Sequence, residues 1–140
     1  MTQLFQETLV ITGKGPGLHD ITGEVAGWLH GLSVDAGLLT LFIAHTSASL
    51  TIQENADADV CRDLEDFFDN LVKRDPSLYR HGAEGLDDMP AHIRSALTST
   101  SLSIPVKGGK PMLGVWQGIY LFEHRDRPQP RKIHLSFQGN

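Results

Sequence analysis

The segment "SLSIPVKGGKPMLGVWQGIYLFEHRDRPQPRKIHLSFQ", residues 101–138, decides the fold class. It contains three strand-like runs, at 101–106, 112–124 and 131–138, with glycine, proline and charged residues between them. The last run alternates between apolar and polar side chains, as a half-buried strand does. The middle run is apolar at both parities, which is typical of a strand buried on both faces. Short connections between successive strands favour antiparallel pairing.

Upstream of this segment, strand-like and helical patterns follow one another. Strands are predicted at 4–13, 37–45 and 47–54, and helices at 21–31, at 57–73 and in a short stretch that includes Pro90. In the short helix we expect an inward face of Ile93, Ala96 and Leu97. The order β-α-β-β-α-α-β-β-β, without repeat or linker, predicts a single α+β domain over residues 1–140, in which a mostly antiparallel sheet packs with two to three helices.

Composition limits the class of protein. Of 140 residues, 40% are apolar and 21% are charged, which predicts a soluble globular domain. A net charge of -5 disfavours non-specific binding to nucleic acid, and no run approaches the roughly 18 apolar residues that a membrane span needs. The single cysteine, Cys61, excludes an internal disulfide. The first ten residues lack the features of a signal peptide, so we expect a cytoplasmic protein.

Three of the seven histidines stand in contexts that suit metal binding. His45 follows a strand, His81 lies in a long loop and His92 lies on the short helix. Three neutral imidazoles that leave a fourth position open suit zinc and a catalytic water. Their intervals of 36 and 11 residues match no compact zinc signature, so solvated structural histidines are the alternative. Asp87 and Asp88 precede His92 and are predicted to orient a ligand, because Asp88 lies four residues before it on one helical face.

Other segments suit anions or acid–base chemistry. The turns "GKGPG" (13–17) and "KGGK" (107–110) and the basic stretch "HRDRPQPRK" (124–132) suit phosphate, although each piece taken alone is better explained as an ordinary hairpin turn with solvated charges. Neither standard nucleotide-binding glycine motif is present. Cys61 lies in an acid-rich helix, which predicts an inert thiol. The carboxylates available for general acid–base work are Glu54, Glu84, Asp87 and Glu123.

Four segments resemble the signature segments of the YjbQ-like family, whose members are also called secondary thiamine-phosphate synthase enzymes. These segments are "HDIT" (19–22), "HTSASLTIQENAD" (45–57), "YRHGAEGLDDMPAHIRSAL" (79–97) and "GVWQGIYLFEHR" (114–125). The resemblance covers nearly the whole chain. It implies an α+β fold, a homotrimer with sites near subunit interfaces, and a weak activity that joins a pyrimidine pyrophosphate to a thiazole phosphate and releases pyrophosphate.

The resemblance also assigns roles to residues. It implies a divalent metal, most simply zinc, on His45, His81 and His92, and catalytic roles for Glu54, Asn55 and Asp87. Arg125, Arg127 and Arg131 are the candidates for receiving phosphate. The function predicted is therefore a metal-binding enzyme that acts on small phosphorylated or pyrophosphorylated substrates. The alternatives are a metal-assisted hydrolase of a small phosphate or amide, and a non-enzymatic module that binds a metabolite or metal.

Overall fold

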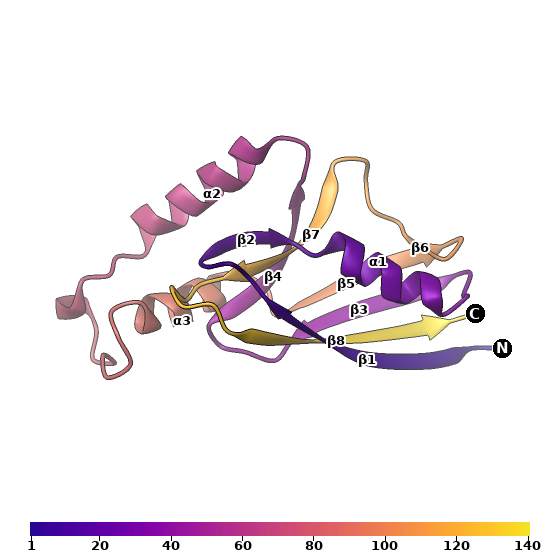
Figure 1. Cartoon of the computed structure of the whole chain (residues 1–140), viewed down its shortest axis with the longest axis horizontal. Helices are drawn as coiled ribbons and strands as arrows, with labels where there is room; N and C mark the ends of the chain where they lie inside the picture. The colour runs from indigo at the N-terminus through magenta and orange to yellow at the C-terminus, as the bar shows by residue number, and fades with distance from the viewer.

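The computed structural model describes all 140 residues, and Figure 1 shows the arrangement of its elements. In chain order these are β1 (Gln3–Thr12), β2 (Gly17–Asp20), α1 (Thr22–Gly31), β3 (Gly37–Ile43), β4 (Ala48–Glu54), α2 (Ala58–Leu71), the short 3-10 helix η1 (Pro76–Leu78), α3 (Asp88–Leu97), β5 (Ser101–Lys107), β6 (Lys110–Pro111), β7 (Gln117–Glu123) and β8 (Pro130–Gly139). None of the helices is long and apolar enough to cross a membrane.

The strands form two sheets in which every pairing is antiparallel. A five-stranded sheet has the order β1-β8-β3-β5-β6, and a three-stranded sheet has the order β2-β7-β4. The predicted single-domain α+β fold with antiparallel strands and three helices is confirmed. The strands divide between two sheets instead of one. The difference arises because β7 pairs with β2 and β4 and not with β6 or β8, its neighbours in sequence.

The core lies between the two sheets, and α1 closes one side of it. Fully buried apolar side chains come from both sheets and from the helix; they include Leu29, Leu39, Leu41, Leu50, Ile119, Leu121, Ile133, Leu135 and Phe137. The opposite face of β7 packs against α2, where the rings of Phe122 and Phe68 meet edge to face at 5.3 Å. Thus β7 is buried on both faces, as its sequence predicts.

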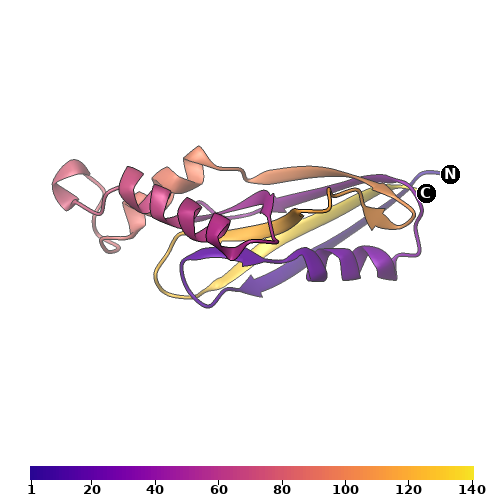
Figure 2. The ribbon, with the colours of Figure 1, turned by 90° about the horizontal axis from the view of Figure 1, so that it is seen from above.

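The helices lie at two ends of the molecule. Figures 1 and 2 show α2, α3 and the loop between them at one end, and α1 with both chain termini at the other. The termini meet because β1 and β8 pair along their whole lengths, with Gln3 opposite Gly139. The end that carries α2 and α3 therefore also carries the loop in which His81 lies and the start of β8.

Two helical details differ from the sequence-based expectation. The second helix ends at Leu71 and not at residue 73, because Val72 adopts an extended conformation and its side chain is buried. The inward face of α3 is not formed by Ala96 and Leu97, which are exposed. Its buried residues are instead Asp88, Pro90, Ala91, Arg94 and Ser95. Charged side chains occupy inward positions of α3 because they find partners there.

Candidate functional site

Three potential metal ligands converge at the start of α3. His81 lies in the loop after η1, Asp88 is the first residue of α3, and His92 follows one helical turn later. One ligating atom from each residue lies within 4.8 Å of the other two. The Nε2 atoms of His81 and His92 lie 2.5 Å and 3.5 Å from the same Asp88 oxygen, Oδ2. Asp88 and His92 share a face because they are four residues apart on a helix.

Arg125 holds this arrangement in place from the end of β7. Its Nη1 donates to Asp88 Oδ1 at 2.7 Å, its Nε donates to Asp87 Oδ2 at 2.9 Å, and its Nη2 donates to the Glu84 carbonyl at 3.1 Å. The Asp126 amide donates to the same Asp87 oxygen at 3.0 Å. All three guanidinium nitrogens are thereby engaged. The structure thus gives Arg125 a positioning role in the loop and not the free phosphate-binding fork that the sequence suggested.

The charges in this region favour ionised carboxylates. Burial by itself raises the pKa of Asp87, but hydrogen bonds from Arg125 and the Asp126 amide outweigh it and leave that pKa below its usual value. Arg74 forms a two-pronged ion pair with Asp126, which lowers the pKa of that carboxyl group. Asp87 and Asp126 therefore remain charged at neutral pH and keep the loop tied to the start of the β7–β8 connection.

The donor set of the cluster fits a divalent transition metal such as zinc. Two imidazoles and a carboxylate are typical zinc ligands at about 2.0–2.2 Å from the ion, which places ligand atoms roughly 3.4 Å apart on a tetrahedron. The spacings of 2.5 Å and 3.5 Å lie on either side of this value. The Asp88 side chain is 3% exposed, whereas the imidazoles of His81 and His92 are 46% and 35% exposed. The histidine side of the cluster is thus open to a further ligand.

A cavity of about 660 Å³ adjoins the cluster. Asp88 and His92 line one part of it, and other polar walls come from β8 and from the segments that precede β4, β5 and β8. The polar residues among them include His45, Thr46, Ser47, Thr100, Gln129 and Arg131. The cavity therefore brings together the candidate metal ligands and a separate group of hydrogen-bonding side chains from distant parts of the sequence.

His45 lines this cavity but is not part of the metal-ligand cluster. Its Nε2 accepts a hydrogen bond from the Lys132 amide at 2.8 Å, and its Nδ1 lies 3.3 Å from Arg131 Nη1. Burial lowers the pKa of His45, and the positive charges of Arg131 and Lys132 lower it further against the opposing effect of Glu123. The structure therefore places Asp88, and not His45, beside His81 and His92.

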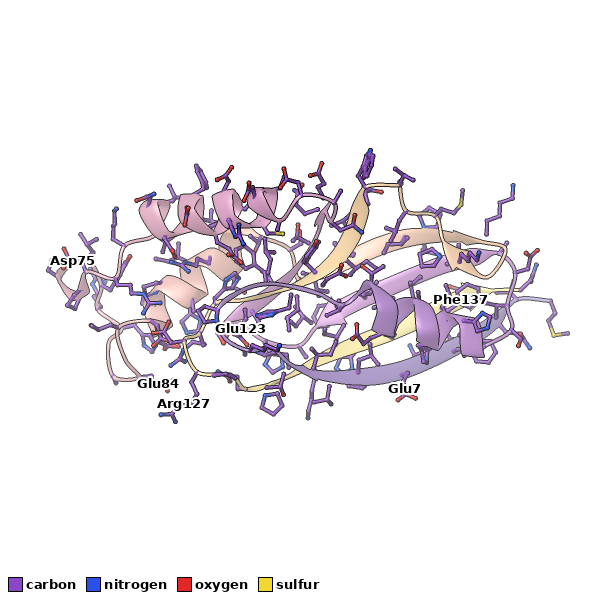
Figure 3. The ribbon with its side chains drawn as sticks, turned by 45° about the horizontal axis from the view of Figure 1, so that its top comes forward. Glu7, Asp75, Glu84, Glu123, Arg127 and Phe137 are labelled. Carbon is purple, nitrogen blue, oxygen red and sulfur yellow. The ribbon has the colours of Figure 1, made fainter.

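The other two predicted phosphate-binding arginines differ sharply in environment. Arg131 is 1% exposed, and its Nε donates to Glu123 Oε1 at 2.8 Å while its Nη2 donates to Glu123 Oε2 and to the Ser47 carbonyl. Arg127 is exposed and lines a shallow depression with Glu84. Figure 3 shows Arg127 and Glu84 at the outer edge of this end of the molecule and Glu123 further inside. Of these two arginines, Arg131 lines the cavity next to the histidines and Arg127 does not.

Glu54 and Asn55 lie at the other end of β4. The register pairs Ala48 with Glu123 and Glu54 with Gln117. Six residues, roughly 20 Å of strand, therefore separate Glu54 from Ala48, at the end of β4 that lies near the cavity. The carbonyl of Glu54 accepts a hydrogen bond from the Tyr120 hydroxyl, and the Asn55 amide donates to the Trp116 carbonyl. Neither side chain lines the cavity. Within one chain the structure does not bring these two candidates to the histidines.

Two residues that matter at the site were given lesser roles by the sequence. Asp88 was expected to orient a ligand, and its four-residue spacing from His92 was the available signal for its place beside the histidines. Glu123 was one of several candidate acids, but its buried pairing with Arg131 had no local signal. Its partner lies eight residues further along the chain, on a strand of the other sheet.

Comparisons with known proteins agree with the fold. The family described as "UPF0047 protein YjbQ-like" matches residues 7–140. A UPF0047 protein of Synechocystis is 52% identical over 96% of this chain and 91% of its own length, and the UPF0047 protein YjbQ of Salmonella typhimurium is 47% identical over 96% and 98%. A conserved hypothetical protein of Thermus thermophilus superposes with a TM-score of 0.82 at 34% identity, over 92% of this chain and 97% of that chain. Because these matches span nearly the whole chain, this protein belongs to the UPF0047 YjbQ-like family.

Proposed function

We propose that this protein is a metal-binding enzyme that acts on small phosphorylated or pyrophosphorylated substrates. His81, Asp88 and His92 would hold a divalent metal, most simply zinc. The observation that supports the proposal most directly is the convergence of three ligating atoms within 4.8 Å of one another, beside a cavity of about 660 Å³. Exposed imidazoles and a buried, oriented carboxylate are the arrangement that an open metal site needs.

The residues around such a site would have separate roles. When bound, the metal would polarise a phosphoryl oxygen or lower the pKa of a bound water. Arg125 keeps Asp88 turned toward the histidines, since it occupies the other carboxylate oxygen. The cavity would hold the substrate, and its polar walls would orient the phosphoryl group.

The family resemblance supports one specific reaction, the secondary synthesis of thiamine phosphate. In that reaction a carbon–nitrogen bond forms and pyrophosphate leaves, so the protein must position two substrates and neutralise the leaving group. A metal-assisted hydrolase of a small phosphate or amide would use the same ligands with an activated water. The two are separated by substrate dependence: pyrophosphate released only with a second organic substrate supports transfer, and release without one supports hydrolysis. Saturable binding without turnover would identify a non-enzymatic binder.

Glu54 and Asn55 enter this proposal only through a second copy of the chain. Glu54 lies at the end of β4 remote from its own histidine cluster. In the homotrimer that the resemblance implies, these two residues would serve the site of a neighbouring chain, with Glu54 as acid–base. Mixing Glu54→Gln and His92→Ala subunits would then restore part of the activity that each variant lacks alone. Sedimentation equilibrium tests the trimer itself.

Metal analysis after dialysis tests the metal site. We expect close to one zinc per chain in the unmodified protein, and a large loss of zinc and of activity in His81→Ala and His92→Ala. His30→Ala is the matched control, because His30 is exposed on α1 at the opposite end of the molecule. An unmodified protein without stoichiometric metal, together with full activity in His92→Ala, would remove the proposal.

A further inference from the structure

We propose that His45 and Arg131 form an oxyanion subsite on the wall of the cavity, in which His45 donates a hydrogen bond through Nδ1 and does not bind the metal. The ligand would be a phosphoryl or pyrophosphoryl group. The identity of this ligand rests on the proposed function, whereas the donor arrangement rests on the structure alone.

The tautomer of His45 follows from its neighbour in β8. The backbone amide of Lys132 lies 2.8 Å from Nε2, and an amide can only donate, so Nε2 must be the nitrogen without a proton. A neutral imidazole carries one N–H, which is then on Nδ1. Protonation of Nε2 would set two N–H groups against each other, and it would place a second positive charge beside Arg131.

Arg131 presents a second donor at the same place. Its Nε and Nη2 are satisfied by Glu123 and by the Ser47 carbonyl. Its Nη1 has one neighbour among the polar side chains, His45 Nδ1 at 3.3 Å. With a proton on Nδ1, both atoms of this contact are donors, so neither satisfies the other. The side chain is 1% exposed, and a buried donor without an acceptor is costly.

An anionic oxygen placed against this pair would accept from both donors. The cavity offers room for it, and the hydroxyl-bearing residues Thr46 and Ser47 line the same wall. A tetrahedral phosphoryl group has several terminal oxygens, so it can use the two N–H groups and the neighbouring hydroxyls together. Glu123 already balances the charge of Arg131, so the subsite selects its ligand by directed hydrogen bonds more than by net charge.

This subsite and the metal cluster face one cavity but use different residues. Asp88 and His92 line the cavity from α3, whereas His45 lines it from the segment between β3 and β4 and Arg131 lines it from β8. A substrate with a phosphoryl group could therefore be held at His45 and Arg131 by donors and approach the metal ligands with another part. His45 would then bind and orient the substrate, which is a different role from the metal-ligand role suggested by the sequence.

Binding of inorganic phosphate and of pyrophosphate to metal-free protein tests the subsite. Calorimetric titration in the presence of a chelator would compare the unmodified protein with His45→Asn and His45→Gln. Asparagine carries its terminal amide near the position of Nδ1, where its nitrogen can donate. Glutamine carries its terminal amide near the position of Nε2, where its oxygen can accept from the Lys132 amide. We expect His45→Gln to weaken phosphate binding by about tenfold or more, and His45→Asn to stay within about threefold. Zinc affinity should be unchanged in both variants.

Two controls make the outcome decisive. His134→Gln changes an exposed histidine on the outer face of the five-stranded sheet and should leave phosphate binding unchanged. Nitrogen-15 NMR of labelled histidine should show His45 protonated at Nδ1 and not at Nε2. Three results would each overturn the subsite: phosphate affinity unchanged in both His45 variants, a proton on Nε2 of His45, or a loss of zinc affinity in the His45 variants as large as that in His92→Ala. If the unmodified protein binds phosphate through His45 but binds no zinc, the proposed metal function fails while the subsite stands.

Discussion

The two walls of the cavity are built in different ways. His81, Asp88 and His92 come from a loop and the first turns of a helix, and a single guanidinium, that of Arg125, ties that loop to β7. On the opposite wall, His45 is held by a backbone amide of β8, and Arg131 is paired with Glu123 inside the fold. The first wall, of His81, Asp88 and His92, is thus held in place by the Arg125 side chain and is called the clamped wall below. The second wall, of His45 and Arg131, is continuous with the core and is called the strand wall.

This difference predicts where substitutions damage binding and where they damage folding. On the clamped wall, the two imidazoles are partly exposed and their loss should leave the sheets intact. On the strand wall, the same kind of change leaves a buried charge without its partner. The variants described next, from the largest expected effect to the smallest, test whether the two walls separate function from stability in this way.

The largest effect is expected at Arg131. Arg131→Met leaves the Glu123 carboxylate, which is 0% exposed, without a counter-charge, so we expect a loss of about 3–5 kcal/mol in the free energy of unfolding. Urea unfolding at neutral pH measures it. Adding Glu123→Gln to the same chain should recover a large part of the loss, because the buried charge is then gone. If the free energy of unfolding of the Arg131→Met protein lay within about 1 kcal/mol of that of the unmodified protein, the strand wall would not be part of the core.

The next effect is expected at Arg125, on the clamped wall. Arg125→Ala frees Asp88 Oδ1 and should lower zinc affinity by about 10–100-fold, with a smaller effect on stability than the change at Arg131. Competition with a chromophoric chelator measures the affinity. Arg127→Ala is the matched control, since Arg127 is exposed and two residues further along the same connection. Equal zinc affinity in Arg125→Ala and Arg127→Ala would contradict the clamp.

The third effect, smaller per pH unit, is a pH dependence of the free energy of unfolding that comes from His124, the residue after Glu123. His124 is buried and accepts or donates only through Nε2, to Ser49 at 2.9 Å; burial lowers its pKa to about 3, with Arg94 and Arg131 adding to the effect. Between the unfolded value of about 6.5 and the folded value, only the unfolded chain binds the proton. Stability should therefore fall as the pH drops through this range, by up to about 1.4 kcal/mol per pH unit.

The control for this pH effect is His124→Gln, which keeps a polar group near Ser49 but does not titrate. Unfolding of both proteins followed in urea between pH 7 and pH 4 should give a shallower dependence for the variant. Parallel curves would show that His124 contributes nothing to acid sensitivity and that carboxylates such as Asp87 and Asp126, whose pKa values are lowered, account for all of it.

The smallest effect is expected at the far end of β4. Glu54→Gln and Asn55→Ala should leave zinc affinity within about twofold of the unmodified protein, because neither side chain lines the cavity of its own chain. The same chelator competition measures this. A tenfold fall would mean that Glu54 reaches a metal cluster directly, which the structure permits only between chains.

Much of the fold could be read from local patterns. The strand β7 was recognisable as buried on both faces because its apolar residues occur at both parities, and α2 because its apolar residues recur at helical spacing. The strands β2 and β6 were missed, since four and two residues are too few to show a period. The inward face of α3 was mispredicted because hydrophobicity alone does not reveal that Asp88 and Arg94 find partners.

The candidate site, like the fold, could be predicted from the sequence only in part. A four-residue spacing on one helix was enough to suggest that Asp88 and His92 act together, and the position of His81 in a nearby loop was consistent with its joining them. The place of His45 was beyond such reasoning. Its neighbours Arg131 and Lys132 are more than 80 residues away in sequence, and they lie beside it because β3 pairs with β8 so that Ile43 faces Ile133.

By itself, then, the sequence determined the α+β class, the helices and longer strands, and the residue types available for metal and phosphate chemistry. The tertiary structure decided which imidazole nitrogens are free, which arginines are already paired, and which carboxylate faces the histidines. The physical reason is one of range. Periodicity and helical spacing act over a few residues, whereas the state of a lone pair or a charge depends on whichever group the sheet register brings next to it.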